Sequence, residues 1–132
     1  MIHFENVTKR FPDGTAAMDA VNVKIQKGEF ISIIGRSGAG KSTMLRLINS
    51  TILPTEGKVH VLGYHLGDHE SARTMRMVRR QVGFIFQQFN LIKTHTVLSN
   101  VLMGRLGYMG TVRGTLGLFS KEDKDKAENV LV

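Results

Sequence analysis

Residues 35–42 read Gly35-Arg36-Ser37-Gly38-Ala39-Gly40-Lys41-Ser42 and fit the pattern G-x-x-x-x-G-K-[ST]. Glycines allow the backbone to coil so that several N–H groups point into one concavity. A helix that begins at such a loop adds the positive end of its dipole to the same place. The stretch therefore predicts a phosphate-binding loop, in which the Lys41 ammonium reaches the phosphates and the Ser42 hydroxyl can bind Mg²⁺.

The segments on either side of this loop have the pattern that the motif requires. Residues 29–34 (EFISII) are rich in Ile and Phe and predict a buried β-strand that runs into the loop. After Lys41 the apolar residues Leu45, Ile48 and Ile52 recur at helical spacing. A strand, a glycine-rich loop and a helix in this order predict an α/β fold of the P-loop type.

The rest of the chain predicts several further short elements. Alternating apolar residues favour strands over 2–11, 16–25 and 58–62, and the short apolar run at 82–86 predicts a further strand. Helical spacing favours helices over 69–80 and 96–104, and Ser120, followed by Glu122 and Asp123, predicts the start of a last helix. The segment 104–118 carries five glycines and is expected to be loop or weakly helical.

Length and composition exclude several classes of protein. The 132 residues suffice for one domain, and 42% hydrophobic with 22% charged residues is an ordinary globular composition. No apolar run approaches the ~20 residues of a transmembrane helix. The amino terminus lacks a signal-peptide layout. The absence of cysteine excludes disulfides and Cys-ligated metals. These features favour the cytoplasm.

The formal net charge of +7 is unevenly spread along the chain. Residues 71–120 contain seven basic residues and no acidic one, whereas the remainder contains 11 of each. A basic band of this kind is typical of proteins that contact nucleic acid, an anionic membrane surface or a phosphate ligand.

With these motifs the chain resembles the first half of an ATP-binding-cassette (ABC) ATPase. GRSGAGKST at 35–43 is similar to the Walker A loop of that family, and VGFIFQQFNL at 82–91 is similar to the segment that carries its Q-loop. The shorter segments LRLIN, PTEG and TVLSNVL are also similar. Residues 106–127 (LGYMGTVRGTLGLFSKEDKDKA) most resemble the ATP-binding subunits of phosphonate importers.

The resemblance implies a domain organisation and a set of nucleotide-binding residues. Residues 1–92 would form the first part of a P-loop ABC ATPase core with antiparallel strands at its N-terminus, and 93–132 would begin a helical subdomain. In this family an aromatic residue near the end of the first strand stacks on adenine, which implies Phe11. A glutamine after a later strand senses Mg²⁺ and the membrane partner, which implies Gln87, with Gln88 as a weaker candidate. The implied ATP-binding residues are Gly35, Arg36, Ser37, Gly38, Ala39, Gly40, Lys41, Ser42, Thr43, Phe11 and Gln87, with Ser42 and Gln87 as Mg²⁺ ligands.

The residues that perform hydrolysis in this family have no counterpart in the chain. Phosphoryl transfer needs a carboxylate that holds Mg²⁺ and a group that positions the attacking water. The family's Walker B aspartate, the following glutamate, the switch histidine and the LSGGQ-like signature loop all match nothing before Val132. After Gln87 the first carboxylate is Glu122, in a polar lysine-rich segment. We therefore expect no catalytic residue here, at most weak nucleotide binding, and no efficient hydrolysis by this chain alone.

Without the family's later strands, residues 29–35 and 82–86 are expected to present unpaired edges and apolar faces. Self-association, domain swapping or marginal stability would follow from this exposure.

The leading interpretation is the ATP-binding subunit of an ABC importer for phosphonates. The family then implies ATP, Mg²⁺, permease subunits, a second copy of the subunit and, indirectly, a solute-binding protein as partners, at the cytoplasmic face of the membrane. The alternatives are a nucleic-acid-associated ABC ATPase, another P-loop enzyme such as a small-molecule kinase, or an inert fragment. Nucleic acid is not expected, because the chain has two Tyr, no Trp and no recognised nucleic-acid-binding module.

Overall fold

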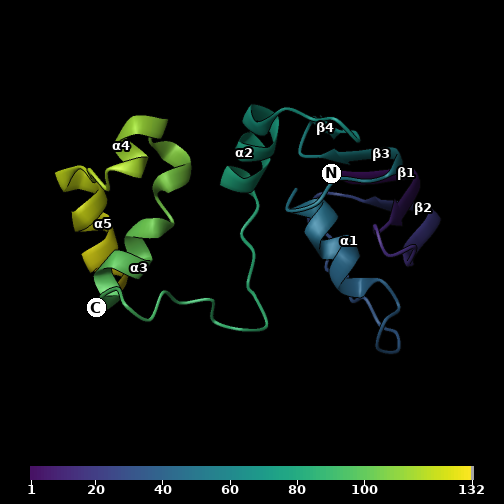
Figure 1. Cartoon of the computed structure of the whole chain (residues 1–132), viewed down its shortest axis with the longest axis horizontal. Helices are drawn as coiled ribbons and strands as arrows, with labels where there is room; N and C mark the ends of the chain where they lie inside the picture. Colours follow the sequence, from purple (N-terminus) through teal and green to yellow (C-terminus); the bar gives the residue numbers. More distant parts are fainter. Residues whose placement is uncertain (132) are drawn as a thin grey trace. The chain divides into compact units, whose positions relative to one another are not determined.

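The computed structural model describes residues 1–131, which form two compact units that divide between Phe84 and Ile85. The first unit contains a β-sheet and two helices, and the second contains short helices only (Figure 1). We describe each unit by itself. The division lies a few residues before position 92, where the resemblance sets the end of the ATPase core, and that domain boundary stays a prediction.

The sheet of the first unit is wholly antiparallel. Its strands lie in the order β2-β1-β3-β4, with β1 at Ile2–Arg10, β2 at Ala16–Ile25, β3 at Glu56–Val61 and β4 at Tyr64–Leu66 (Figure 1). The strands expected over 2–11, 16–25 and 58–62 are confirmed. The sequence did not predict β4, because three residues are too short to show an alternating pattern.

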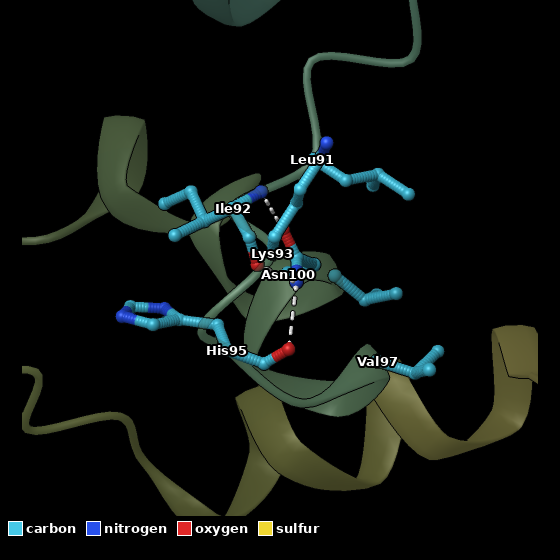
Figure 2. Close-up of a pocket in the computed structure, with 7 residues that line it drawn as sticks. Leu91, Ile92, Lys93, His95, Val97 and Asn100 are labelled. Atoms are coloured by element: carbon cyan, nitrogen blue, oxygen red, sulfur yellow. Dashed lines mark hydrogen bonds between the residues drawn. The ribbon is translucent and has the colours of Figure 1, made fainter.

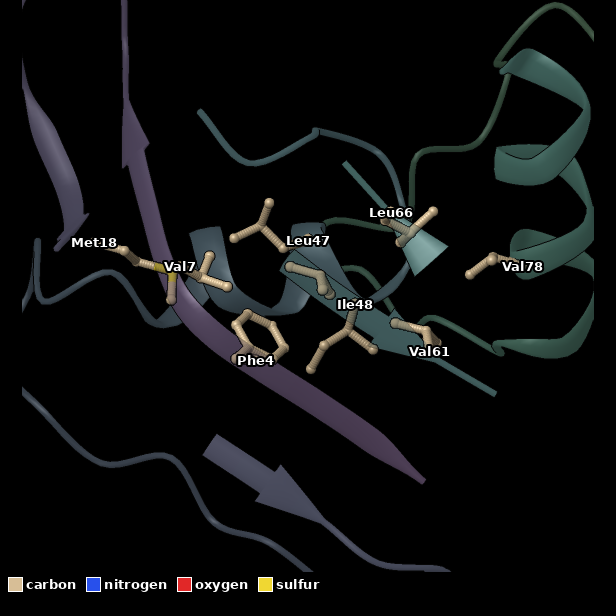
Figure 3. Packing of buried hydrophobic residues seen from close by; sticks show 9 residues of the cluster. Phe4, Val7, Met18, Leu47, Ile48, Val61, Leu66 and Val78 are labelled. Carbon is tan, nitrogen blue, oxygen red and sulfur yellow. The ribbon is translucent and has the colours of Figure 1, made fainter. Parts of the chain in front are cut away.

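One face of this sheet forms the core together with two helices, α1 at Lys41–Ile48 and α2 at Ala72–Gln81. The register pairs Phe4 with Val59, and Val59 with Leu66, so their side chains lie on the same face of the sheet. Leu47 and Ile48 of α1 and Val78 of α2 pack against this face (Figure 3). The phosphate-loop helix is therefore held on the sheet through its C-terminal half.

Two of the predicted strands do not form. Residues 29–34 and 82–86 have no strand pairing, and the side chains of Phe30, Ile34 and Ile85 are 95%, 90% and 98% exposed. A strand needs a neighbour for its N–H and C=O groups, and within residues 1–131 the sheet offers these segments none. The prediction of strands at 29–34 and 82–86 is therefore wrong. The prediction that these segments expose apolar side chains is confirmed.

The second unit consists of α3 at Val97–Met103, the 3₁₀ turn η1 at Leu106–Tyr108, α4 at Thr111–Thr115 and α5 at Lys121–Leu131. The helices expected from 96 and after Ser120 are confirmed, and 104–118 contains only short helical turns. Ser120 Oγ accepts a hydrogen bond from the Asp123 N–H at 3.1 Å and donates one to the Asp123 carboxylate at 2.7 Å. The sequence pattern at 120–123 thus acts as a helix cap.

Asp123 also joins α5 to the end of α3. Its carboxylate accepts a hydrogen bond of 2.7 Å from Arg105 Nε, just beyond α3. Leu102 and Ala127 are buried on these two helices. The hydrogen bond from Arg105, followed by that from Ser120, holds the pKa of the Asp123 carboxyl below its ordinary value of 3.8.

Asp123→Asn should destabilise the second unit at pH 7. Because the pKa of Asp123 is lowered in the folded state, its carboxylate contributes fully to the free energy of unfolding above pH 3.8. This contribution is lost as the pH falls through the pKa of the folded state. The difference in free energy of unfolding between variant and wild type should therefore be smaller at pH 3 than at pH 7. Urea unfolding followed by circular dichroism at both pH values measures this, with Asp125→Asn as the control. An equal loss of unfolding free energy at pH 7 and pH 3 would contradict the stabilising role of the Asp123 carboxylate.

The protein should self-associate at micromolar concentration, because Phe30, Ile34 and Ile85 leave apolar side chains in water. Replacing these three residues with serine should shift the sedimentation-velocity distribution toward monomer. Val130→Ser, at a residue 77% exposed on α5, is the matched control. A monodisperse wild-type monomer that unfolds cooperatively would show the prediction to be wrong.

Candidate functional site

Gly40 joins the glycine-rich loop to α1, and both its backbone conformation and its surroundings favour glycine. It is the N-cap of α1 with φ +80°, in the left-handed region that favours glycine. A Cβ atom at Gly40 would overlap the carbonyl oxygen of Ala17 on β2. Gly38 also has a positive φ of +82°, but a Cβ there would meet open space. The loop is therefore anchored at Gly40 against the β1–β2 hairpin.

Lys41 folds back over the loop that precedes it. Its Nζ donates hydrogen bonds to the carbonyl oxygens of Gly35 at 2.8 Å and Arg36 at 2.7 Å. The side chain thus bridges from the start of α1 to the start of the loop, and it places a positive charge beside residues 35–41. These carbonyl contacts are ones that a phosphate oxygen can replace.

The first turn of α1 adds N–H groups to this charge. The first helical hydrogen bond runs from Met44 N–H to Gly40 O at 2.9 Å, so the N–H groups of Lys41, Ser42 and Thr43 have no partner within the helix. The first turn contains no acidic residue. N–H groups, the helix dipole and an ammonium at one place form a site suited to an anion such as phosphate.

Phe11 lies on the hairpin end nearest to this loop. It directly follows β1, where the register pairs Arg10 with Ala16, the neighbour of the Ala17 residue that lies against Gly40. The Phe11 ring is half-buried, with Lys9 Nζ 5.7 Å from its centroid. The structure thus provides an aromatic surface on the hairpin that contacts the loop, and stacking on adenine stays a prediction.

The structure supports the predicted roles of Gln87 and of the Mg²⁺ ligands less directly than that of Lys41. Gln87 is exposed and belongs to the second unit, so its assignment to the nucleotide site rests on the resemblance of 82–91 to the family's Q-loop segment and stays a prediction. Within residues 1–131 no group of three or more His, Cys, Asp or Glu residues could hold a metal ion. Mg²⁺ is usually held by one or two protein oxygens together with substrate phosphates, which fits the exposed Ser42 hydroxyl at the first turn of α1.

The second unit contains a hollow of about 420 Å³ that the sequence did not indicate (Figure 2). The side chain of Asn100 organises it: its Oδ1 accepts from Ile92 N–H at 2.8 Å, and its Nδ2 donates to the carbonyls of Ile92 and Thr96. The sequence gives no signal for it beyond the polar pair Ser99 and Asn100 among the apolar residues of α3. The lining residues are Leu91, Ile92, Lys93, His95, Val97, Asn100 and Val101.

The sequence profile of the ABC transporter family matches residues 18–132. Together with the loop at the start of α1, this match shows that the chain belongs to the ABC transporter family, as the motifs predicted. The fold is part of the ABC ATPase fold and contains N-terminal antiparallel strands together with helices.

Among curated relatives, the chain is similar to phosphonates import ATP-binding proteins. It is 52% identical to PhnC of Bacillus thuringiensis subsp. konkukian (strain 97-27) over 127 residues, which cover 96% of this chain and 49% of the relative. It is 45% identical to PhnC 2 of Halalkalibacterium halodurans over 131 residues, which cover 99% of this chain and 53% of the relative. The chain therefore spans about half the length of these relatives.

Among solved structures, the chain is similar to a dimeric, post-hydrolysis ATP-binding cassette, MJ0796, bound to ADP and Pi. The TM-score is 0.79 at 38% identity, and the match covers 98% of this chain and 55% of that one. In the part of this chain that the structure describes, no helix is both long and apolar enough to cross a membrane.

Gly40→Ala should destabilise the first unit more than Gly38→Ala. The positive φ costs both variants about 1–2 kcal/mol, but only the Cβ at position 40 meets the Ala17 carbonyl. That overlap should add about 1–3 kcal/mol. Urea unfolding of the two variants beside wild type measures the difference. Equal losses of unfolding free energy in Gly40→Ala and Gly38→Ala would show that the contact with β2 does not fix the loop.

Proposed function

We propose that this chain supplies the nucleotide-binding loop of the ATP-binding subunit of an ABC importer, with phosphonates as the solute class. The observation that carries the proposal is the junction at residues 35–43, where Lys41 Nζ lies over the loop and the first N–H groups of α1 have no partner within the helix. The family membership and the names of the relatives support ATP as the anion and phosphonate as the solute.

The residues of the proposed site have separate roles. Lys41 Nζ leaves the carbonyls of Gly35 and Arg36 and binds the β- and γ-phosphates. The N–H groups at the start of α1 bind further phosphate oxygens. The Ser42 hydroxyl contributes one ligand to a Mg²⁺ ion that arrives with the nucleotide, and the Phe11 ring stacks on adenine. Gln87 adds a contact to Mg²⁺ and to the membrane partner.

Hydrolysis belongs to the complete subunit in this proposal and not to this chain alone. The acid-free stretch from 71 to 120 provides no carboxylate for Mg²⁺ or for the attacking water. In the complete subunit, ATP binding would bring two copies together and drive permease subunits at the cytoplasmic face of the membrane. A solute-binding protein would act indirectly, because the solute does not touch this subunit.

The second candidate, a nucleic-acid-associated ABC ATPase, is favoured by one feature of α2. Arg73, Arg76 and Arg80 recur at i, i+3 and i+7 and lie on one side of this helix, opposite the buried Val78. Retention on DNA that falls steeply with salt at physiological ionic strength would favour this candidate over the importer.

Lys41→Ala should weaken binding of ATP in the presence of Mg²⁺. Losing a charged donor to phosphate costs about 1.5–3 kcal/mol, or roughly tenfold to more than a hundredfold in affinity. Isothermal titration calorimetry on wild type and variant measures this, with Lys58→Ala, an exposed lysine on β3, as the control. Equal affinity of Lys41→Ala and wild type would contradict the phosphate site. ATP turnover by the purified chain that Lys41→Ala abolishes would contradict the absence of hydrolysis.

A further inference from the structure

Helix α1 is followed, just beyond its C-cap, by a residue in an unusual conformation, Ser50. After the C-cap Asn49, the Ser50 N–H donates to the Leu47 carbonyl at 3.1 Å, and the Thr51 N–H donates to the Arg46 carbonyl at 2.9 Å. These two bonds form a Schellman motif, in which the residue after the C-cap is left-handed and usually glycine. Ser50 has φ +53° and is fully buried, so its side chain calls for an explanation.

The explanation lies in two hydrogen bonds to α2. Ser50 Oγ donates to the Met75 carbonyl at 3.0 Å, and the Arg79 guanidinium donates to the Ser50 carbonyl at 2.9 Å. Glycine at position 50 would adopt the same backbone without strain but could not form the first bond. We call Ser50, Met75 and Arg79 the α1–α2 latch.

The latch acts on the end of α1 that lies opposite the phosphate site. Eight helical residues span roughly 12 Å and move as a rigid body, so a shift at Ser50 changes the direction of the N–H groups at Lys41 and Ser42. The Arg79 cation also lies beside the negative end of the α1 dipole. α2 continues along the chain into residues 82–87, so the latch joins the loop helix to the element that leads to Gln87.

We propose that Ser50 and Arg79 are positioning residues for the phosphate site. The latch holds α1 in the direction that presents its N–H groups to phosphate, and breaking it weakens phosphate binding although neither side chain touches the phosphate. This inference rests on the proposed function, since it concerns the same site.

Ser50→Gly separates positioning from stability. It removes the hydroxyl but relieves the left-handed strain, so its unfolding midpoint should stay near that of wild type. Its affinity for ATP with Mg²⁺ should nevertheless fall roughly five- to tenfold, the scale of one hydrogen bond. Arg79→Ala should lower the affinity similarly, and Arg79→Lys, which keeps a donor for the Ser50 carbonyl, should recover most of it. Arg73→Ala, on the exposed side of the same helix, is the matched control and should bind like wild type.

Calorimetric affinity and urea unfolding on the same samples decide the outcome. Wild-type affinity in both Ser50→Gly and Arg79→Ala would overturn the proposal. A loss of ATP affinity that occurs only in Arg79→Ala, and that its unfolded fraction accounts for, would also overturn the proposal. The latch would then only stabilise the fold.

Failure of the wild-type chain to bind ATP would instead contradict the proposed function. The latch is then judged on the ligand-free chain, where the amide NMR signals of Gly38, Gly40 and Lys41 should move in Ser50→Gly. Unchanged signals would overturn the latch by themselves.

Discussion

The close approach of the Gly40 backbone to the Ala17 carbonyl is the constraint on which the site depends. It fixes the end of the glycine-rich loop against β2 at the point where α1 begins. Because Leu47 and Ile48 bury the other half of α1 on the sheet, the helix has a defined direction and its first-turn N–H groups have a defined location. The geometry of the proposed anion site therefore depends on the packing of α1 on the sheet as well as on the loop sequence.

The positive charges of the chain have structural roles besides the binding role that we propose for Lys41. Arg79 donates to a buried carbonyl at the end of α1, and Arg105 donates to the buried Asp123 carboxylate between α3 and α5. Lys41, which lies outside the basic band, provides the cation at the phosphate loop. A net charge of +7 therefore does not by itself indicate a polyanionic partner.

The sequence predicted those features that depend on local chemistry. The loop, the start of α1, the β1–β2 hairpin and the Ser120 cap all follow from residue types a few positions apart. Residues 29–34 and 82–86 were predicted wrongly, because an apolar run indicates burial but does not say which strand will pair with it. The contacts of Ser50 escaped prediction because Met75 and Arg79 lie 25 and 29 residues away. The contacts of Asn100 also escaped prediction, because nothing in the sequence of α3 pairs it with Ile92, eight residues earlier.

A crystal structure of this chain grown with ATP and Mg²⁺ tests the central claim most directly. The account predicts the β-phosphate within about 3.2 Å of the N–H groups between Gly38 and Ser42. It also predicts that Lys41 Nζ has left the carbonyls of Gly35 and Arg36 for the phosphates. Nucleotide bound elsewhere, such as along the arginines of α2, with Lys41 still on those two carbonyls, would contradict it.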